Sequence, residues 1–107
     1  MQTSSSNQFG SKIRQLRENN KLLLRHLAPL LDMDTPHLSK IERGERLAKK
    51  NLIPIFAKVL NASQDELFTL WLADQIVDVV KDSNLALDAM MVAEASVKYQ
   101  IKQKVKE

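Results

Sequence analysis

The chain has no cysteine, and it has only two glycines and three prolines among its 107 residues. The absence of cysteine excludes a disulfide framework and thiolate chemistry. Few helix-breaking residues and no strand-like alternation of apolar and polar residues predict an all-α chain. No apolar run approaches the roughly 18 residues of a membrane span, and residues 1–8 lack the pattern of a signal peptide. We therefore expect a cytoplasmic protein with no membrane partner.

The sequence features typical of enzymes are also missing. There is no glycine-rich phosphate loop, and no serine–histidine–acid set stands out. The two histidines, His26 and His37, have no carboxylate or thiolate partners at a spacing that suits a metal ion. We expect no enzymatic activity, no metal and no cofactor.

Charge is distributed unevenly along the chain. The net charge is +3, but residues 1–50 carry ten Lys and Arg against five Asp and Glu, whereas residues 51–107 carry six against eight. A basic half is the expected footprint of a surface that binds duplex nucleic acid. A modest basic excess is also common on solvated helices, so the charge alone leaves both interpretations open.

Residues 23–46 have the pattern of two short helices joined by a tight polar turn. Leucines spaced for one apolar face mark the first helix, and residues 32–34 interrupt it. Thr35 is expected to cap the second helix, because its hydroxyl can accept from free N–H groups, and Pro36 fits the first turn. Gly44 is expected to end this helix in a left-handed conformation.

The second of these helices, at about residues 35–43, has two different sides. Leu38 and Ile41 lie three residues apart and are expected to anchor it to the core. Polar side chains fall on the opposite side. A helix that is apolar behind and polar in front suits the major groove of B-DNA, which is about 12 Å wide.

Four stretches of the sequence stand at a distinctive spacing: Ile13–Arg17, Leu27–Ala28, Leu38–Arg46 and Leu60–Phe68. With them, residues 8–72 resemble the Cro/CI (XRE-like) family of helix-turn-helix DNA-binding regulators. The resemblance implies a lambda-repressor-like five-helix domain. It also implies that a recognition helix at about Thr35–Arg43 enters the major groove of double-stranded DNA.

The resemblance assigns roles to individual residues as well. The family's base-reading positions fall on Thr35, Pro36, His37, Ser39 and Lys40. Phosphate contacts are expected from Arg25, Arg43, Arg46, Lys49 and Lys50. Arg17 and Glu42 match a family ion pair that orients the recognition helix. For each basic residue, a solvated surface charge is the alternative.

Three positions depart from the family pattern. Leu24 stands where the family has a glutamine that touches a phosphate, and Asp32 stands where it has a turn glycine. Pro29 lies inside the helix that precedes the turn. It removes the hydrogen bond to the carbonyl of Arg25 and is expected to kink or loosen that helix.

The remaining helix boundaries follow from capping patterns. Ser5 and Gln8 predict a helix over about residues 7–19, in which Gly10 suggests a close helix contact. Asn51 is expected to cap a fourth helix that has Pro54 in its first turn. The capping box of Ser63 and Glu66 starts a fifth helix. Residues 1–7 are expected to form a flexible N-terminus.

Residues 73–107 extend beyond the common domain of the family. The fifth helix has a second apolar face, and after a break at residues 82–84 another helix is expected to about residue 104, with a polar end over residues 100–107 that frays. The extension is expected to be a dimer interface or a hairpin that covers the second face. The dimer residues are expected to be Phe68, Leu72, Ile76, Val79, Leu87, Met90 and Met91.

Taken together, the sequence predicts a sequence-specific transcriptional regulator that binds double-stranded DNA as a homodimer. Among the roles that the family resemblance implies, a restriction–modification controller and an autorepressing antitoxin are both compatible with a chain of this size. The alternative is a protein-interaction module or antitoxin whose C-terminal helices bind a protein partner, with DNA binding secondary.

Overall fold

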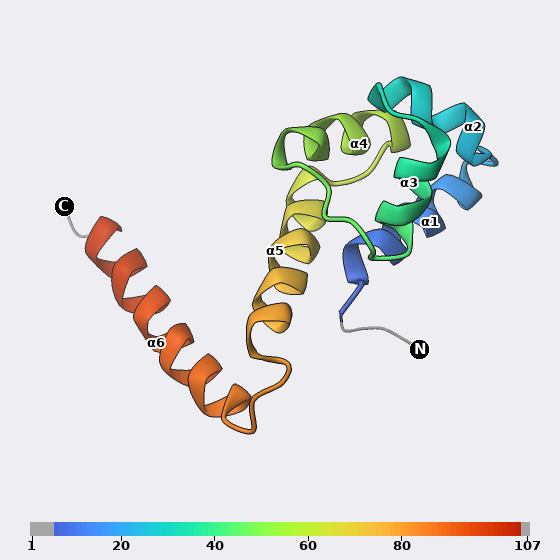
Figure 1. Cartoon of the computed structure of the whole chain (residues 1–107). Helices are drawn as coiled ribbons and strands as arrows, with labels where there is room; N and C mark the ends of the chain where they lie inside the picture. The colour runs from blue at the N-terminus through green and yellow to red at the C-terminus, as the bar shows by residue number, and fades with distance from the viewer. Residues whose placement is uncertain (1–5, 106–107) are drawn as a thin grey trace.

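In a computed structural model, residues 6–105 can be described, and they form helices joined by short turns (Figure 1). The helices are α1 (Gln8–Asn19), α2 (Leu24–Leu27), α3 (Thr35–Glu42), α4 (Ile53–Leu60), α5 (Gln64–Val80) and α6 (Ala86–Val105). Two 3₁₀ turns, η1 (Ala28–Leu31) and η2 (Lys50–Leu52), precede α3 and α4. No strand occurs between residues 6 and 105, and the prediction of an all-α fold with a helical extension is confirmed.

The core lies between α1 and α5, where every helix of the first 71 residues contributes apolar side chains. Ile13, Leu38 and Phe56 have no measurable solvent exposure, although they come from three different helices. The rings of Phe9 and Phe56 pack edge to face at a centroid distance of 5.7 Å. Each such side chain contributes about 1.5–3 kcal/mol on burial. This packing fixes where α3 stands relative to α1.

Pro29 alters the helix before the turn as the sequence predicts. The α-helical hydrogen bonding of α2 stops at Leu27, and the chain continues as the 3₁₀ turn η1, with Pro29 in its first turn. Asp32 then adopts the left-handed conformation, with φ of 55°. An aspartate tolerates this conformation better than most residues, so it can replace the turn glycine of the family.

Two of the predicted caps are wrong, and one is confirmed. The cap of α3 is Asp34, whose carboxylate accepts a hydrogen bond from the His37 amide at 2.9 Å, while Thr35 is already helical. Asn51 lies inside η2 and makes no cap for α4. Ser63 caps α5 through the amide of Glu66 at 3.1 Å. For α1, the predicted cap Ser5 lies outside the described residues.

The start of α1 is held by a carboxylate from α5. Asp74 accepts hydrogen bonds from the amides of Gln8 and Phe9, both at 2.9 Å, and from the hydroxyl of Ser6. The side chain of Asn7 donates to the carbonyl of Glu42 at 2.9 Å. Ser6 and Asn7, which we expected in a flexible N-terminus, are therefore attached to the domain. Asp74 also shows that α5 belongs to the domain beyond residue 72, where we had placed the boundary.

Gly10 lies where α1 crosses the end of α3. A β-carbon at this position would come within 2.4 Å of the Ile41 carbonyl oxygen and 2.7 Å of the Glu42 carbonyl oxygen. No side chain fits such an approach, so the close contact expected from the sequence is present. Gly44, with φ of 76°, ends α3 in the predicted left-handed conformation.

The last helix stands apart from the domain. After a turn at residues 81–85, α6 diverges from α5 (Figure 1), and every side chain described between residues 87 and 104 is exposed. Leu72 and Ile76 on α5 remain about half exposed. The predicted hairpin, in which the last helix would cover the second face of α5, is therefore not formed. The helix continues through Val105, so residues 100–105 are helical.

Candidate nucleic-acid interface

The recognition helix predicted from the sequence is α3, and its two sides differ sharply. Leu38 and Ile41 are buried on the inner side, together with the carboxylate of Glu42. Pro36, Lys40 and Arg43 are exposed. These three positions are separated by four and three residues, so they share the outward side of the helix. The helix is thus anchored along one side and open to a partner along the other.

The five predicted base-reading residues are not equally accessible. Pro36 and Lys40 are exposed, whereas Thr35, His37 and Ser39 are half-buried along the two edges of the outward side. The hydroxyl of Ser39 accepts a hydrogen bond from Arg43 Nη1 at 2.9 Å. Lys40 is therefore the exposed basic residue of this set.

A buried ion pair joins α1 to the end of α3. Arg17 Nε donates to Glu42 Oε2 at 2.7 Å, and Arg17 Nη2 donates to Glu42 Oε1 at 3.0 Å. Arg17 Nη1 also donates to the carbonyl of Leu22 at 2.9 Å, which connects the pair to the chain leading into α2. The hydrogen bonds that Arg17 donates to the Glu42 carboxylate raise the pKa of Arg17. The pair thus fixes both helices of the helix-turn-helix against α1.

The five predicted phosphate contacts lie at three places. Arg25 is exposed on α2, Arg43 caps the end of α3, and Arg46, Lys49 and Lys50 are exposed on the segment that follows. Arg43 is engaged within the chain, because its guanidinium donates to both carboxylate oxygens of Glu45 at 3.0 Å. All five cations are therefore exposed to solvent, and Arg43 differs from the other four because it is paired with Glu45.

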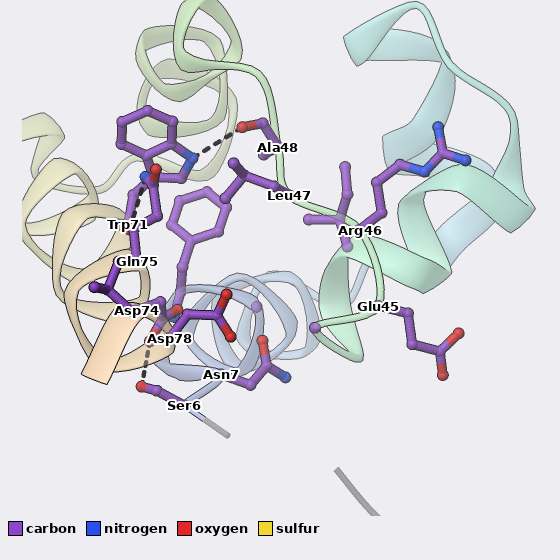
Figure 2. Close-up of a pocket in the computed structure, with 15 residues that line it drawn as sticks. Ser6, Asn7, Glu45, Arg46, Leu47, Ala48, Trp71, Asp74, Gln75 and Asp78 are labelled. Atoms are coloured by element: carbon purple, nitrogen blue, oxygen red, sulfur yellow. Dashed lines mark hydrogen bonds between the residues drawn. The ribbon is translucent and has the colours of Figure 1, made fainter. Parts of the chain in front are cut away.

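The segment after α3 is fastened to α5 by a tryptophan. The indole Nε1 of Trp71 donates to the carbonyl of Ala48 at 2.8 Å, as the dashed line in Figure 2 shows. Trp71 is buried, and its ring packs edge to face against Phe68 at 6.3 Å. The indole hydrogen bond fixes the segment that carries Arg46, Lys49 and Lys50 to α5.

An open cleft of about 410 Å³ lies between this segment, the start of α1 and α5 (Figure 2). Its lining includes the rings of Phe9 and Trp71 and the carboxylates of Asp74 and Asp78. The carboxylate of Asp74 already accepts hydrogen bonds from the start of α1, and Asp78 Oδ1 lies 2.8 Å from Lys81 Nζ. Within residues 6–105, no group of three or more His, Asp or Glu side chains could hold a metal ion. We assign no ligand to this cleft.

Sequence reasoning missed three residues that shape the interface: Asp34, Glu45 and Asp74. Asp34 carries a local signal, because it lies two residues before Pro36 and aspartate is a preferred cap. Glu45 lies inside the Leu38–Arg46 stretch that carries the family resemblance, and no sequence pattern predicts its pairing with Arg43. Asp74 has no local signal, since its partners at residues 6–9 are more than sixty positions away in the sequence.

The apolar side chains of the C-terminal part are mostly unpartnered. Among the described residues, fifteen large apolar side chains are exposed; four lie before residue 60 and eleven lie between residues 72 and 101. Phe68 differs from the other predicted dimer residues, because it is half-buried against Trp71. None of the helices in the described part of the chain is long and apolar enough to cross a membrane.

An anchored α3, a preceding short helix and a tight turn between them define a helix-turn-helix protein. The sequence model of the helix-turn-helix domain matches residues 8–70. The chain belongs to this family of helix-turn-helix DNA-binding domains.

The fold is also found in a solved structure. The crystal structure of the clp gene regulator ClgR from Corynebacterium glutamicum matches with a TM-score of 0.54 and 18% sequence identity, over 92% of each chain. At this identity the likeness shows a shared fold. A comparison with curated proteins finds no significant match.

Proposed function

We propose that the protein is a sequence-specific transcriptional regulator that binds double-stranded DNA as a homodimer in the cytoplasm. The observation that carries the proposal is the outward side of α3, where Pro36, Lys40 and Arg43 are exposed while the opposite side is fixed in the core. Rigid presentation of a short helix lets its side chains reach base edges in a major groove.

Base reading would be divided among residues of different chemistry. Lys40 can donate to the O6 or N7 of guanine, and Thr35 can contact a thymine methyl group. His37 and Ser39 offer donors or acceptors, whereas Pro36 offers apolar contact. Arg25 and the exposed Arg46, Lys49 and Lys50 supply sequence-independent affinity through phosphates.

The homodimer is supported by the apolar side chains that the single chain leaves exposed. Ile76 on α5 is 51% exposed, and Leu87 and Val97 on α6 are 76% and 55% exposed. Most of the stability of a helix in a protein comes from tertiary packing of its apolar face, which α6 lacks within the single chain. Pairing with the same surface of a second copy would bury these residues. Two recognition helices would then meet half-sites about 34 Å apart, or a multiple of that spacing.

A binding titration tests the DNA part of the proposal. Fluorescence anisotropy would compare DNA from upstream of the protein's own gene with a scrambled duplex at two salt concentrations. We expect binding to the native duplex at least about a thousandfold tighter than to the scrambled one. Equal, weak and steeply salt-dependent binding to both would contradict sequence specificity.

Two lysine variants sharpen this experiment. Lys40→Ala should weaken specific binding strongly while leaving the oligomeric state unchanged. Lys58→Ala removes the same charge from an exposed position on α4 and is the matched control. An equal loss of affinity in both variants would mean that α3 contributes only general charge.

The second candidate function is a protein-interaction module, such as an antitoxin that binds a partner through its C-terminal helices. The observation that favours it is the same exposed surface of α6, which a different protein could cover. Sedimentation of the full chain separates the two. We expect a dimer, and we expect Ile76→Asp to convert it to a monomer. A native chain that stays monomeric at high concentration would favour the partner-binding function.

A further inference from the structure

The guanidinium of Arg43 is held at the outward side of α3 by two neighbouring side chains. Its Nε and Nη2 donate to the two carboxylate oxygens of Glu45, each at 3.0 Å. Its Nη1 donates at 2.9 Å to the hydroxyl of Ser39, one helical turn earlier. The contact to Ser39 holds the guanidinium back along the helix, toward the predicted base-reading residues.

Counting donors shows what the guanidinium can still bind. An arginine side chain has five N–H groups, one on Nε and two on each terminal nitrogen. Glu45 and Ser39 accept three of them, which leaves one donor on Nη1 and one on Nη2. One donor on each terminal nitrogen can match the O6 and N7 acceptors on the major-groove edge of guanine.

The net charge of the Arg43–Glu45 pair favours a contact to a base over a contact to a phosphate. The mutual hydrogen bonds raise the pKa of Arg43 and lower the pKa of Glu45. Both groups therefore stay ionised at neutral pH, and the pair has no net charge. A neutral pair gains little from the phosphate backbone, whose attraction depends on the cations that neutralise it. Base edges carry hydrogen-bond acceptors but no net charge. The neutrality of the pair therefore does not weaken hydrogen bonds from the two remaining donors to a base.

We propose that Glu45 is a positioning residue that holds Arg43 against Ser39, so that Arg43 reads a guanine in each half-site instead of contacting a phosphate. This inference rests on the proposed function and changes one of its assignments, because the sequence alone placed Arg43 among the phosphate contacts. Glu45 itself touches no base. Exposed ion pairs are weak in general, but bidentate arginine–carboxylate geometry is the arrangement in which they do orient a side chain.

Selection of binding sites from a random duplex library tests the proposal with the full chain. For the native protein we expect one G·C pair in each half-site whose replacement weakens binding roughly 5- to 150-fold. Arg43→Lys keeps the charge but loses the two-donor edge. It should weaken the preference at that base pair and keep the preferences at other positions.

Glu45→Gln tests the positioning role. It should weaken the preference at the same base pair and steepen the dependence of log affinity on log salt by about one, because a released Arg43 can reach a phosphate. Glu18→Gln is the matched control, because it removes the same charge from another exposed arginine–glutamate pair, with Arg14 at 3.1 Å. The control should leave the base preferences and the salt dependence close to native.

The outcomes separate this inference from the function on which it rests. If the native chain selects a clear site, but Arg43→Lys and Glu45→Gln leave its base preferences unchanged, the positioning role is overturned and the proposed function stands. Arg43→Ala with uniformly weaker binding and a salt slope shallower by about one would identify a phosphate contact and also overturn it. A native chain that selects no sequence at all contradicts both.

Discussion

Leu38 in α3 and Leu87 in α6 are the same residue type in helices of similar regularity, yet their exposed fractions are 0% and 76%. Leu38 belongs to one core with buried side chains of α1, α4 and α5. Leu87 stays exposed because α6 diverges from α5 and its described side chains do not pack against the domain (Figure 1). An apolar helix face therefore predicts that the face is buried, but it does not specify which surface buries it. In the domain, the other helices of the same chain bury these faces. We propose that a second copy of the chain buries the apolar face of the extension.

The largest effect is expected from breaking the buried ion pair of the domain. Glu42→Gln leaves the buried guanidinium of Arg17 without a counter-ion and should lower the free energy of unfolding by about 3–5 kcal/mol. Urea unfolding followed by the fluorescence of Trp71, the single tryptophan, measures it. Glu18→Gln breaks an exposed pair and should cost about 0.5 kcal/mol or less. Equal effects of the two variants would show that burial of the pair does not matter.

Truncating the two leucines tests the contrast between core and extension directly. Leu38→Ala should cost about 2–5 kcal/mol, because it removes buried apolar area and leaves a cavity. In dilute protein, Leu87→Ala should change stability by less than about 0.5 kcal/mol. At high concentration its effect should grow, because dimer formation contributes to stability by mass action. An effect of Leu87→Ala that does not depend on concentration would argue against the dimer surface.

Asp74→Asn probes the long-range cap that joins α5 to α1. The amide keeps one oxygen acceptor but loses the negative charge and the second acceptor at the start of the helix. We expect a loss of about 1–2 kcal/mol in urea unfolding. Asp78→Asn, one turn further along α5 and exposed, serves as the control. Equal losses of unfolding free energy in the two variants would show that the cap at α1 adds no stability.

The smallest predicted effect concerns the link between α5 and the segment after α3. Trp71→Phe keeps most of the buried ring but removes the indole donor to the Ala48 carbonyl. It should lower the free energy of unfolding by about 1 kcal/mol, as measured by circular dichroism. DNA affinity should fall further than this change in stability explains, because the segment carries Arg46, Lys49 and Lys50. Unchanged DNA affinity would mean that these cations do not depend on the position of the segment.

Much of the fold follows from local signals that a single sequence contains. The apolar spacing of Leu38 and Ile41, the left-handed stop at Gly44 and the effect of Pro29 on α2 were all predicted correctly. Each depends on residues within one or two helical turns, where backbone preference and side-chain spacing act directly. The caps at Thr35 and Asn51 were wrong, because several nearby residues could serve and local competition decided among them.

The sequence by itself determined that the chain is helical, that a helix-turn-helix lies near residues 23–46, and which side of α3 faces the core. These properties are encoded by periodicity and turn chemistry, which are local. The tertiary structure decided that Asp74 caps α1, that Trp71 holds the segment after α3, that Arg43 pairs with Glu45 and Ser39, and that α6 does not fold back on α5. The first two join residues far apart in the sequence, and the last two depend on side-chain direction and on the angle of a turn. Composition and periodicity specify none of these relations, because packing of the helices decides the first two and local geometry decides the last two.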